Sequence, residues 1–467
     1  MTQLSNKTVA ITGGGLAGLA AACALSDSGF RVTLFERRPY LGGRASSYEH
    51  PGTGEVVDNC QHVLFRVCTN LIEFYRRIGV EDKIRWYDTM TFLEPGGRAT
   101  VMRASPLPAP LHTAPSFLRF PFLTADDKLA ISRALAPLTL KVQSDTGRSF
   151  LDWCREHGQT QNAIERFWKP ILVSALSEDL DRISVSAVGQ VVRESMKSRV
   201  ARHMGVPSIP LTDLYNRAGD YIRARGGEIR FRTSLETFHS ESSHVRIHAG
   251  NGEQAFEYLV VALPFENVER VLPRDSSSAV LREQISHFES SSITGIHLWF
   301  DRKISDLDHA VLLDRTMQWM FHKSRLLTSL NGSANESGGS YIELVVSSSK
   351  NLIEMSRGEI VDLSLKEVRE FFPAAREATL VKSAVIKEVR ATYSPQPGID
   401  AHRPQQATTW PRVFLAGDWT ATGWPATMEG AVRSGYLAVK ALMQSAGEKA
   451  NVLTPDLPTG GLMRLFG

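Results

Sequence analysis

A glycine-rich turn near the start of the chain constrains the fold more than any other feature. Gly13, Gly15 and Gly18 form the pattern G-x-G-x-x-G between an apolar segment typical of a buried strand and an Ala/Leu-rich helix. A second strand, predicted over 31–36, ends at Glu36. In such a unit the first glycine turns the chain, the second admits a pyrophosphate, and the third allows close helix–strand packing. The spacing predicts a dinucleotide-binding parallel sheet in which Glu36 accepts hydrogen bonds from ribose hydroxyls.

A second glycine pair, Gly42-Gly43, follows this unit and directly precedes Arg44. Paired glycines allow another close approach of backbone to ligand, and a guanidinium group suits a pyrophosphate. A surface hairpin is the alternative interpretation of this segment.

A second anchor for the same ligand lies near the other end of the chain. A strand predicted over 413–418 ends at Gly417-Asp418, and a helix is predicted from about Ala426. The carboxylate can bind a polyhydroxyl ribityl chain, and the helix N-terminus favours the electron-rich edge of a flavin ring. A nicotinamide enzyme does not need this distant anchor, whereas the longer FAD molecule does. The sequence therefore predicts FAD as the cofactor.

Size and composition narrow the remaining choices. A chain of 467 residues predicts two structural units, and its net charge of +3 is too small to indicate a nucleic-acid partner. The 4 cysteines form no CxxC pair and lack zinc-like histidine spacing, so we expect free thiols and no metal site. With no apolar run of about 18 residues, we expect a cytoplasmic protein that can rest peripherally on the inner face of the membrane. No feature indicates an oligomeric state.

The chain resembles a known superfamily in these blocks. The Glu36…Gly42-Gly43-Arg44 segment, Ala262-x-Pro264 and Gly417-Asp418…Met428-Glu429-Gly430-Ala431 are similar to the flavin amine oxidases and phytoene desaturases. Further segments resemble the bacterial squalene-associated branch, the hydroxysqualene dehydroxylases: VDNCQHVLF, SPLPAPLHTAPSFLRFPF, RFWKPILVSAL, SSITGIHLWFDR, QWMFHK and RATYSPQPG. The likeness extends to about residue 445. Cys60 departs from it, because this branch is expected to carry glycine in a D-N-G-Q-H segment.

The resemblance implies which residues contact FAD. They belong to the two glycine blocks, the start of a later strand and the C-terminal block: Gly13, Gly15, Leu16, Ala17, Gly18, Glu36, Arg37, Gly42, Gly43, Arg44, Ala45, Leu235, Gly417, Asp418, Ala426, Thr427 and Met428.

The predicted architecture is α/β, with a discontinuous Rossmann-like FAD-binding domain and a substrate domain that mixes helices with an antiparallel sheet. The FAD-binding domain is expected to use residues 1–85, 205–275 and 400–445, including a β-meander formed by GGEIRF, SSHVRIHA and AFEYLVVALP with a turn at Asn251-Gly252. The substrate domain is expected to be helical in 86–204 and strand-rich in 276–399. Residues 446–467 are expected to form a loose C-terminal tail.

The resemblance implies reductive removal of the allylic hydroxyl of hydroxysqualene, a long apolar isoprenoid, giving squalene for hopanoid synthesis. Hydroxide leaves poorly, so a proton or hydrogen-bond donor should assist its departure. His62 and Gln61 are the catalytic candidates, because the segment after Asp58 lies near the flavin in this superfamily. Alternatively these side chains shape the pocket or bind the cofactor. Asp58 either orients a neighbouring group or is a buried structural carboxylate.

The apolar, proline-rich segment 104–123 is predicted to be an irregular loop. Its apolar side chains, including Phe117, Leu118, Phe120 and Phe122, suit a membrane-resting mouth for an isoprenoid. Internal packing is the alternative. Likewise, Trp299, Trp319 and Phe321 either line the substrate cavity or belong to the core.

Other functions stay open. A carotenoid or squalene desaturase would share the flavin motifs but oxidise its substrate. An amine oxidase lacks any positive sign in the sequence. A non-catalytic isoprenoid escort of the same fold would not need Glu36, Arg44 and Asp418, which are all present.

Overall fold

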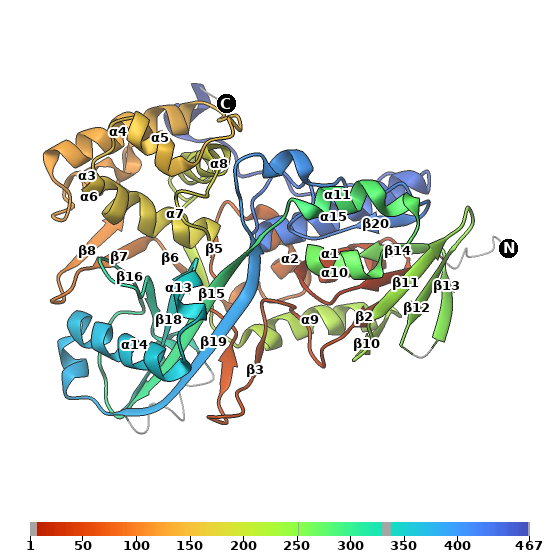
Figure 1. The fold of residues 1–467 in the computed structure, drawn as a ribbon, viewed down its shortest axis with the longest axis horizontal. Helices are drawn as coiled ribbons and strands as arrows, with labels where there is room; N and C mark the ends of the chain where they lie inside the picture. Colours follow the sequence, from red (N-terminus) through yellow and green to blue (C-terminus); the bar gives the residue numbers. More distant parts are fainter. Residues whose placement is uncertain (1–6, 251, 329–337, 466–467) are drawn as a thin grey trace.

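The computed structural model describes residues 7–250, 252–328 and 338–465. Two sheets dominate this part of the chain, a parallel one and a larger mixed one, and helices cover both (Figure 1). The long strands β15 (Ser290–Phe300) and β19 (Leu380–Tyr393) run through the centre of the molecule.

The parallel sheet is built from segments far apart in the sequence. Its strands, in spatial order, are β10 (Glu228–Phe231), β2 (Arg31–Glu36), β1 (Thr8–Thr12), β14 (Tyr258–Val261) and β20 (Val413–Leu415). Every neighbouring pair is parallel. The carboxyl ends of these strands therefore meet at one edge, where open parallel sheets bind their ligands.

Two helices cross closely beside this sheet. The Ala-rich helix α1 (Leu16–Asp27) has eleven of its twelve residues buried, as expected for a helix that is apolar on all sides. It packs against α15 (Met428–Ser445), and a Cβ added at Gly435 would lie 2.3 Å from the carbonyl oxygen of Ala17. Helix α9 (Leu211–Arg223) also contacts α1.

The predicted meander is partly wrong. GGEIRF contains β10 and AFEYLVVALP contains β14, and both strands join the parallel sheet instead of the antiparallel strands. The antiparallel sheet consists of β11 (Leu235–Ser240), β12 (Val245–Ala249) and β13 (Gly252–Phe256). Asn251 of the predicted turn lies outside the described residues.

The mixed sheet has the strand order β19, β15, β18 (Ser340–Ser347), β17 (Trp319–Phe321), β16 (His309–Leu312), β7 (Thr89–Leu93) and β8 (Ala99–Arg103). Its pairs are antiparallel except that of β16 with β7. The span 86–204 is therefore not purely helical. One face packs in a common core with α14 (Arg357–Phe371).

A helical layer lies beside the far end of this sheet (Figure 1). It comprises α3 (Ala114–Leu118), α4 (Ala125–Leu140), α5 (Phe150–Glu156), α6 (Gln161–Ala163), a π-helical turn (Ile164–Trp168), α7 (Lys169–Leu176) and α8 (Val185–Met196). The segment 104–123 is thus not wholly irregular. Phe117, Phe120 and Phe122 are buried in the core of this layer, whereas Leu118 is 62% exposed.

The C-terminal segment after α15 packs on the body of the molecule. Thr454 N donates to Asn70 Oδ1 at the start of α2 (Thr69–Arg77), and Leu462 N donates to the carbonyl of Ala109. Met463 is buried. The prediction of a loose tail is therefore wrong for the described part of residues 446–467. No helix in the described ranges is both long and apolar enough to cross a bilayer.

Candidate functional site

A cavity of about 500 Å³ opens at the carboxyl edge of the parallel sheet. The first glycine block, Glu36, the Ala262-x-Pro264 segment and Gly417-Asp418 all follow strands of this sheet and line the cavity. Most residues expected to contact the cofactor lie around it: Gly13, Gly15, Leu16, Ala17, Glu36, Arg37, Gly42, Gly43, Arg44, Ala45, Leu235, Gly417, Asp418, Ala426, Thr427 and Met428.

Gly18 does not line the cavity but allows its floor to form. A Cβ at this position would lie 1.9 Å from the carbonyl oxygen of Gly13, so only glycine permits the helix to start here. Gly13 itself has φ +104°, a backbone conformation that favours glycine.

The ribose end of the cavity is built around Glu36. Its carboxylate accepts hydrogen bonds from Gly14 N at 2.6 Å and Arg38 N at 2.8 Å, which fix its orientation at the end of β2. Helix α1 begins after Gly15, and no side chain caps it. Its first N–H groups and its dipole therefore suit a phosphate.

The other end of the cavity carries a charge pair. Arg44 Nη2 donates to Asp418 Oδ1 at 2.7 Å, while Arg44 Nη1 donates to the carbonyl of Ala391. Thr427 caps α15 by accepting a hydrogen bond from Gly430 N. The Glu36 carboxylate, the uncapped start of α1, the Arg44 guanidinium and the Asp418 carboxylate line one cavity, and these are the groups that would hold the ribose, the phosphates and the ribityl chain of FAD.

A second, apolar cavity of about 660 Å³ adjoins the first. Phe117, Phe167, Trp319 and Phe321 line it, together with aliphatic residues from α2, α4, α7 and α8. Trp299 does not line it, because its ring stacks on Tyr341 at 4.3 Å. Trp319 and Phe321 therefore follow the cavity interpretation, whereas Trp299 is half-buried and belongs neither to the cavity nor to a core cluster.

The two cavities share part of their walls, and we call this shared wall the junction. It consists of Cys60, Gln61, Val63, Ser174, Ala175, Ser177, Ile293, Thr427 and Met428. A long apolar ligand in the second cavity can thus reach the flavin end of the first. Gly295 of β15 makes room for the junction backbone, because a Cβ there would lie 3.3 Å from the carbonyl oxygen of Asn59.

The two catalytic candidates occupy different places. Gln61 belongs to the junction, whereas His62 lines the flavin cavity alone. His62 Nδ1 lies 2.8 Å from the carbonyl oxygen of Cys60, which can only accept, so this nitrogen carries the hydrogen. Burial lowers the pKa of His62. A neutral ring then presents Nε2 as an acceptor, and the catalytic role of both residues stays a prediction.

A buried charge cluster behind Gln61 escaped the sequence analysis. Lys323, the first residue of α12 (Lys323–Leu326), donates to Asp58 Oδ2 at 2.6 Å and to Gln61 Oε1 at 2.8 Å. Its Nζ lies 3.3 Å from Glu343 Oε2 on β18. Lys323 is 1% exposed and Glu343 fully buried. Asp58, which ends β4 (Val56–Asp58), is therefore a buried structural carboxylate, but one that is tied to a junction residue.

The two carboxylates of this cluster differ in their partners. Burial opposes ionisation of Asp58, yet Lys323, the Ser47 hydroxyl and Leu211 N together hold its pKa below the usual value. Neither oxygen of Glu343 has a well-directed donor among the described residues. Burial, reinforced by Asp58, raises the pKa of Glu343 to about 7 although Lys323 opposes the shift.

Glu429 caps a helix, but not the one that contains it. Its carboxylate accepts hydrogen bonds from Asn70 N and Leu71 N at the start of α2, and from Arg433 one turn further along α15. It also lines the apolar cavity. The residue thus links the helix beside the cofactor to the wall of the second cavity.

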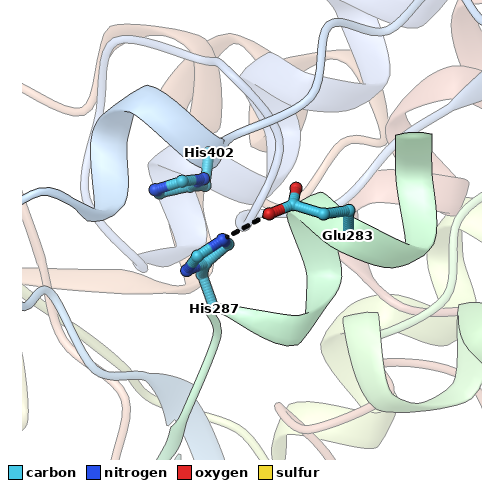
Figure 2. A group of neighbouring side chains, drawn as sticks. All are labelled: Glu283, His287 and His402. Atoms are coloured by element: carbon cyan, nitrogen blue, oxygen red, sulfur yellow. Dashed lines mark hydrogen bonds and ion pairs between the residues drawn. The ribbon is translucent and has the colours of Figure 1, made fainter. Parts of the chain in front are cut away.

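Among the described residues, one group has the composition of a metal site: Glu283, His287 and His402 (Figure 2). His287 Nε2 lies 2.9 Å from Glu283 Oε1. The two imidazole rings stack with centroids 3.6 Å apart and an angle of 22°. Their in-plane lone pairs therefore run side by side instead of converging on one ion, and none of the three residues lines either cavity.

Gly18→Ala is expected to abolish most of the flavin binding, because the added Cβ displaces the Gly13 carbonyl and opens the phosphate turn. The flavin-to-protein absorbance ratio of the purified variant measures this. Gly252→Ala is the matched control, because its Cβ meets nothing within 4 Å. Full flavin content in Gly18→Ala would contradict the assignment of this turn.

Glu343→Gln is expected to change how stability depends on pH. Because the pKa of Glu343 rises from 4.5 to about 7 on folding, its contribution to stability is fully present below pH 4.5 and declines as the pH rises through 7. The variant should therefore gain melting temperature relative to the wild type at pH 8, but not at pH 5. Melting curves test this, with the exposed Glu377→Gln as control. A pH-independent difference would refute the raised pKa.

Comparisons with known proteins agree with this geometry. Residues 16–443 match the family model described as flavin containing amine oxidoreductase. The 15-cis-phytoene desaturase of Synechococcus elongatus is 28% identical, over 94% of this chain and 96% of its own. A probable zeta-carotene desaturase of the same organism is also 28% identical, over 94% of this chain and 98% of its own.

A solved structure supports the fold. The crystal structure of an oxidoreductase from Methanosarcina mazei superposes with a TM-score of 0.70 at 16% identity, covering 94% of this chain and all of that one. The family match spans most of the chain, including α1, the mixed sheet and α15. The chain therefore belongs to the flavin-containing amine oxidoreductase family, and it is an FAD-dependent oxidoreductase with carotenoid desaturases among its relatives.

Proposed function

We propose that the protein is an FAD-dependent reductive dehydroxylase that converts hydroxysqualene to squalene. The observation that carries this proposal is the junction, where an apolar cavity of about 660 Å³ meets the flavin cavity beside the carboxamide of Gln61. The sequence resemblance in the segments around Asp58, 104–123 and 290–300 supports the same assignment.

The apolar cavity provides what such a substrate needs. Aromatic and aliphatic side chains take up the hydrocarbon chain and exclude water from the junction. The Gln61 carboxamide donates one N–H to the carbonyl of His62, and we assign its other N–H to the oxygen of the substrate at the junction. A donor at this place stabilises an oxygen that leaves the substrate.

The reaction balances as a two-electron reduction. The carbon–oxygen bond of the allylic alcohol breaks, a carbon–hydrogen bond forms, and the hydroxyl leaves as water with one added proton. When bound, reduced FAD supplies the hydride and is oxidised by two electrons. The chain's own residues hold the alcohol at the junction and keep water from competing with the hydride.

A carotenoid desaturase is the second candidate, favoured by the two relatives that are 28% identical to this chain. Such an enzyme would use oxidised FAD to remove hydrogen from a long polyene, and the apolar cavity suits that chain as well. The substrates of desaturation are hydrocarbons, however, and they offer no oxygen to the donor at Gln61. The junction therefore favours the dehydroxylase.

An anaerobic single turnover tests the direction of the reaction. Hydroxysqualene added to the reduced protein is expected to restore the oxidised flavin spectrum and to yield one squalene per flavin. Flavin that stays reduced, together with bleaching of the oxidised protein by phytoene or squalene, would replace this proposal with the desaturase.

We also propose that the mouth of the apolar cavity rests on a membrane. Pro110, Leu111 and Phe117 line this cavity, and Leu111 is also 48% exposed, so the cavity reaches the surface here. Leu107 and Leu118 are exposed in the same segment. Helix η8 (Gly461–Leu465) packs beside it and adds Leu462 and Leu465: both are exposed.

Positive charge accompanies these leucines. Arg103, Arg119 and Arg464 are exposed around them, an arrangement that suits anionic lipid headgroups. The phenylalanines of the segment are buried and cannot enter a bilayer, so the leucines replace them as the expected membrane contacts.

The double variant Leu107→Ser/Leu118→Ser is expected to weaken binding to phosphatidylglycerol-containing vesicles about tenfold, because it removes two apolar side chains that the bilayer would bury. Vesicle co-sedimentation measures this, and Val381→Ser, exposed on β19, serves as control. Equal binding of all three proteins would place the membrane contact elsewhere or exclude it.

A further inference from the structure

The orientation of the Gln61 carboxamide is set from behind the junction. A carboxamide can rotate by half a turn and exchange its oxygen for its nitrogen. Here Gln61 Oε1 accepts from Lys323 Nζ at 2.8 Å, and Nε2 donates to the carbonyl of His62 at 3.0 Å. An ammonium group is only a donor, so it binds the oxygen and excludes the rotated state. The NH₂ group is thereby turned away from the cluster.

Lys323 can do this because its charge is held in place. The ammonium group has three hydrogens, and three oxygens surround it, from Asp58, Gln61 and Glu343. Burial lowers the pKa of Lys323, but Asp58 and Glu343 together raise it above its usual value. The lysine therefore stays charged without access to water.

The other groups that face Glu343 carry no charge at neutral pH. His297 on β15 pairs with Glu343 across the sheet, and burial lowers its pKa to about 3. Burial also raises the pKa of Tyr341, on β18, and of Cys60 well above their usual values. Lys323 and Asp58 are thus the charged groups that act most strongly on Glu343, and the cluster of these three side chains is neutral when Glu343 is protonated.

We propose that Lys323, held by Asp58 and Glu343, is a positioning residue that fixes the Gln61 carboxamide so that its free N–H faces an oxygen of the substrate at the junction. This inference rests on the proposed function, because it assigns the recognition of the substrate hydroxyl to one side chain and its support. The fixed carboxamide also makes the cavity selective for isoprenoid alcohols over the matching hydrocarbons.

Glu343 adds a pH dependence to this arrangement. When its carboxyl group loses its proton, the second negative charge draws Lys323 toward β18 and away from Gln61. The carboxamide is then held less firmly. The preference for an alcohol should therefore be greater at pH 6 than at pH 8.5, and Glu343→Gln should keep the high value at both.

Binding of farnesol and of farnesene to the oxidised holoprotein tests the inference without turnover. Both probes are short isoprenoids, and only farnesol has a hydroxyl group. Their dissociation constants are measured by the perturbation of the flavin absorbance. One net hydrogen bond predicts that the wild type binds farnesol about three- to tenfold more tightly than farnesene.

Two variants test the arrangement, one by removing the buried ion pair and the other by removing the Gln61 carboxamide. Lys323→Met/Asp58→Asn removes both charges of the buried pair, which avoids leaving one of them uncompensated. Gln61→Met removes the carboxamide and leaves the cluster intact, and the pH profile of the farnesol preference in Glu343→Gln tests the role of Lys323 if the first variant does not fold. Lys382→Met/Glu55→Gln removes a comparable pair on the surface and is the control.

The expected result is that both test variants lose the preference for farnesol, keep their affinity for farnesene within about twofold, and retain flavin. A wild type without the preference would overturn the inference. So would loss of the preference in Gln61→Met alone, because Gln61 would then act without Lys323. If the test variants lost affinity for both probes equally, the cluster would be only a structural support and the inference would be wrong.

These outcomes separate the inference from the proposed function. If hydroxysqualene fails to reoxidise the reduced wild type while the farnesol preference persists, the reaction is wrong and the binding role of Lys323 and Gln61 stands. If turnover occurs but the preference for farnesol is absent, the proposed reaction stands and the binding role of Lys323 and Gln61 is wrong.

Discussion

The buried ion pair between Lys323 and Asp58 joins the two parts of the molecule. Lys323 follows β17 of the mixed sheet, and Asp58 ends β4 and accepts a hydrogen bond from Leu211 N at the start of α9, which packs on α1. Removing one partner of such a pair typically costs about 3–5 kcal/mol, because the other charge stays buried. The same ammonium group holds Gln61. One contact therefore contributes both to the attachment of the mixed sheet to the cofactor-binding part and to the polarity of the junction.

The cofactor cavity was predictable from the sequence because its determinants are local. Each binding residue lies at the end of a strand of the parallel sheet or in the segment that follows it, and parallel strands bring their carboxyl ends to one edge without further information. The charge cluster has no such local pattern, since Asp58 and Lys323 are 265 residues apart. One signal was present: Glu343 is the only charged residue in the apolar strand SYIELVVS, and a buried carboxylate needs a partner.

The wrong predictions have equally specific causes. An alternating strand such as GGEIRF carries no information on whether it pairs in parallel, so β10 was placed in the meander. Proline excludes a helix interior, but Pro115 lies in the first turn of α3, where its missing N–H is not needed. Composition alone does not show which apolar side chains of segment 104–123 point inward, and three phenylalanines do.

Glu429 couples the walls of the two cavities through the start of α2. Thr427 and Met428 touch the cofactor cavity, and the next residue holds the first turn of α2 through two backbone N–H groups. Leu71 of α2 in turn lines the apolar cavity. A substitution that shifts the start of α15 to alter flavin affinity will therefore also reshape the apolar cavity. Cofactor retention and substrate range are traits that natural variation or directed evolution must change together in this protein.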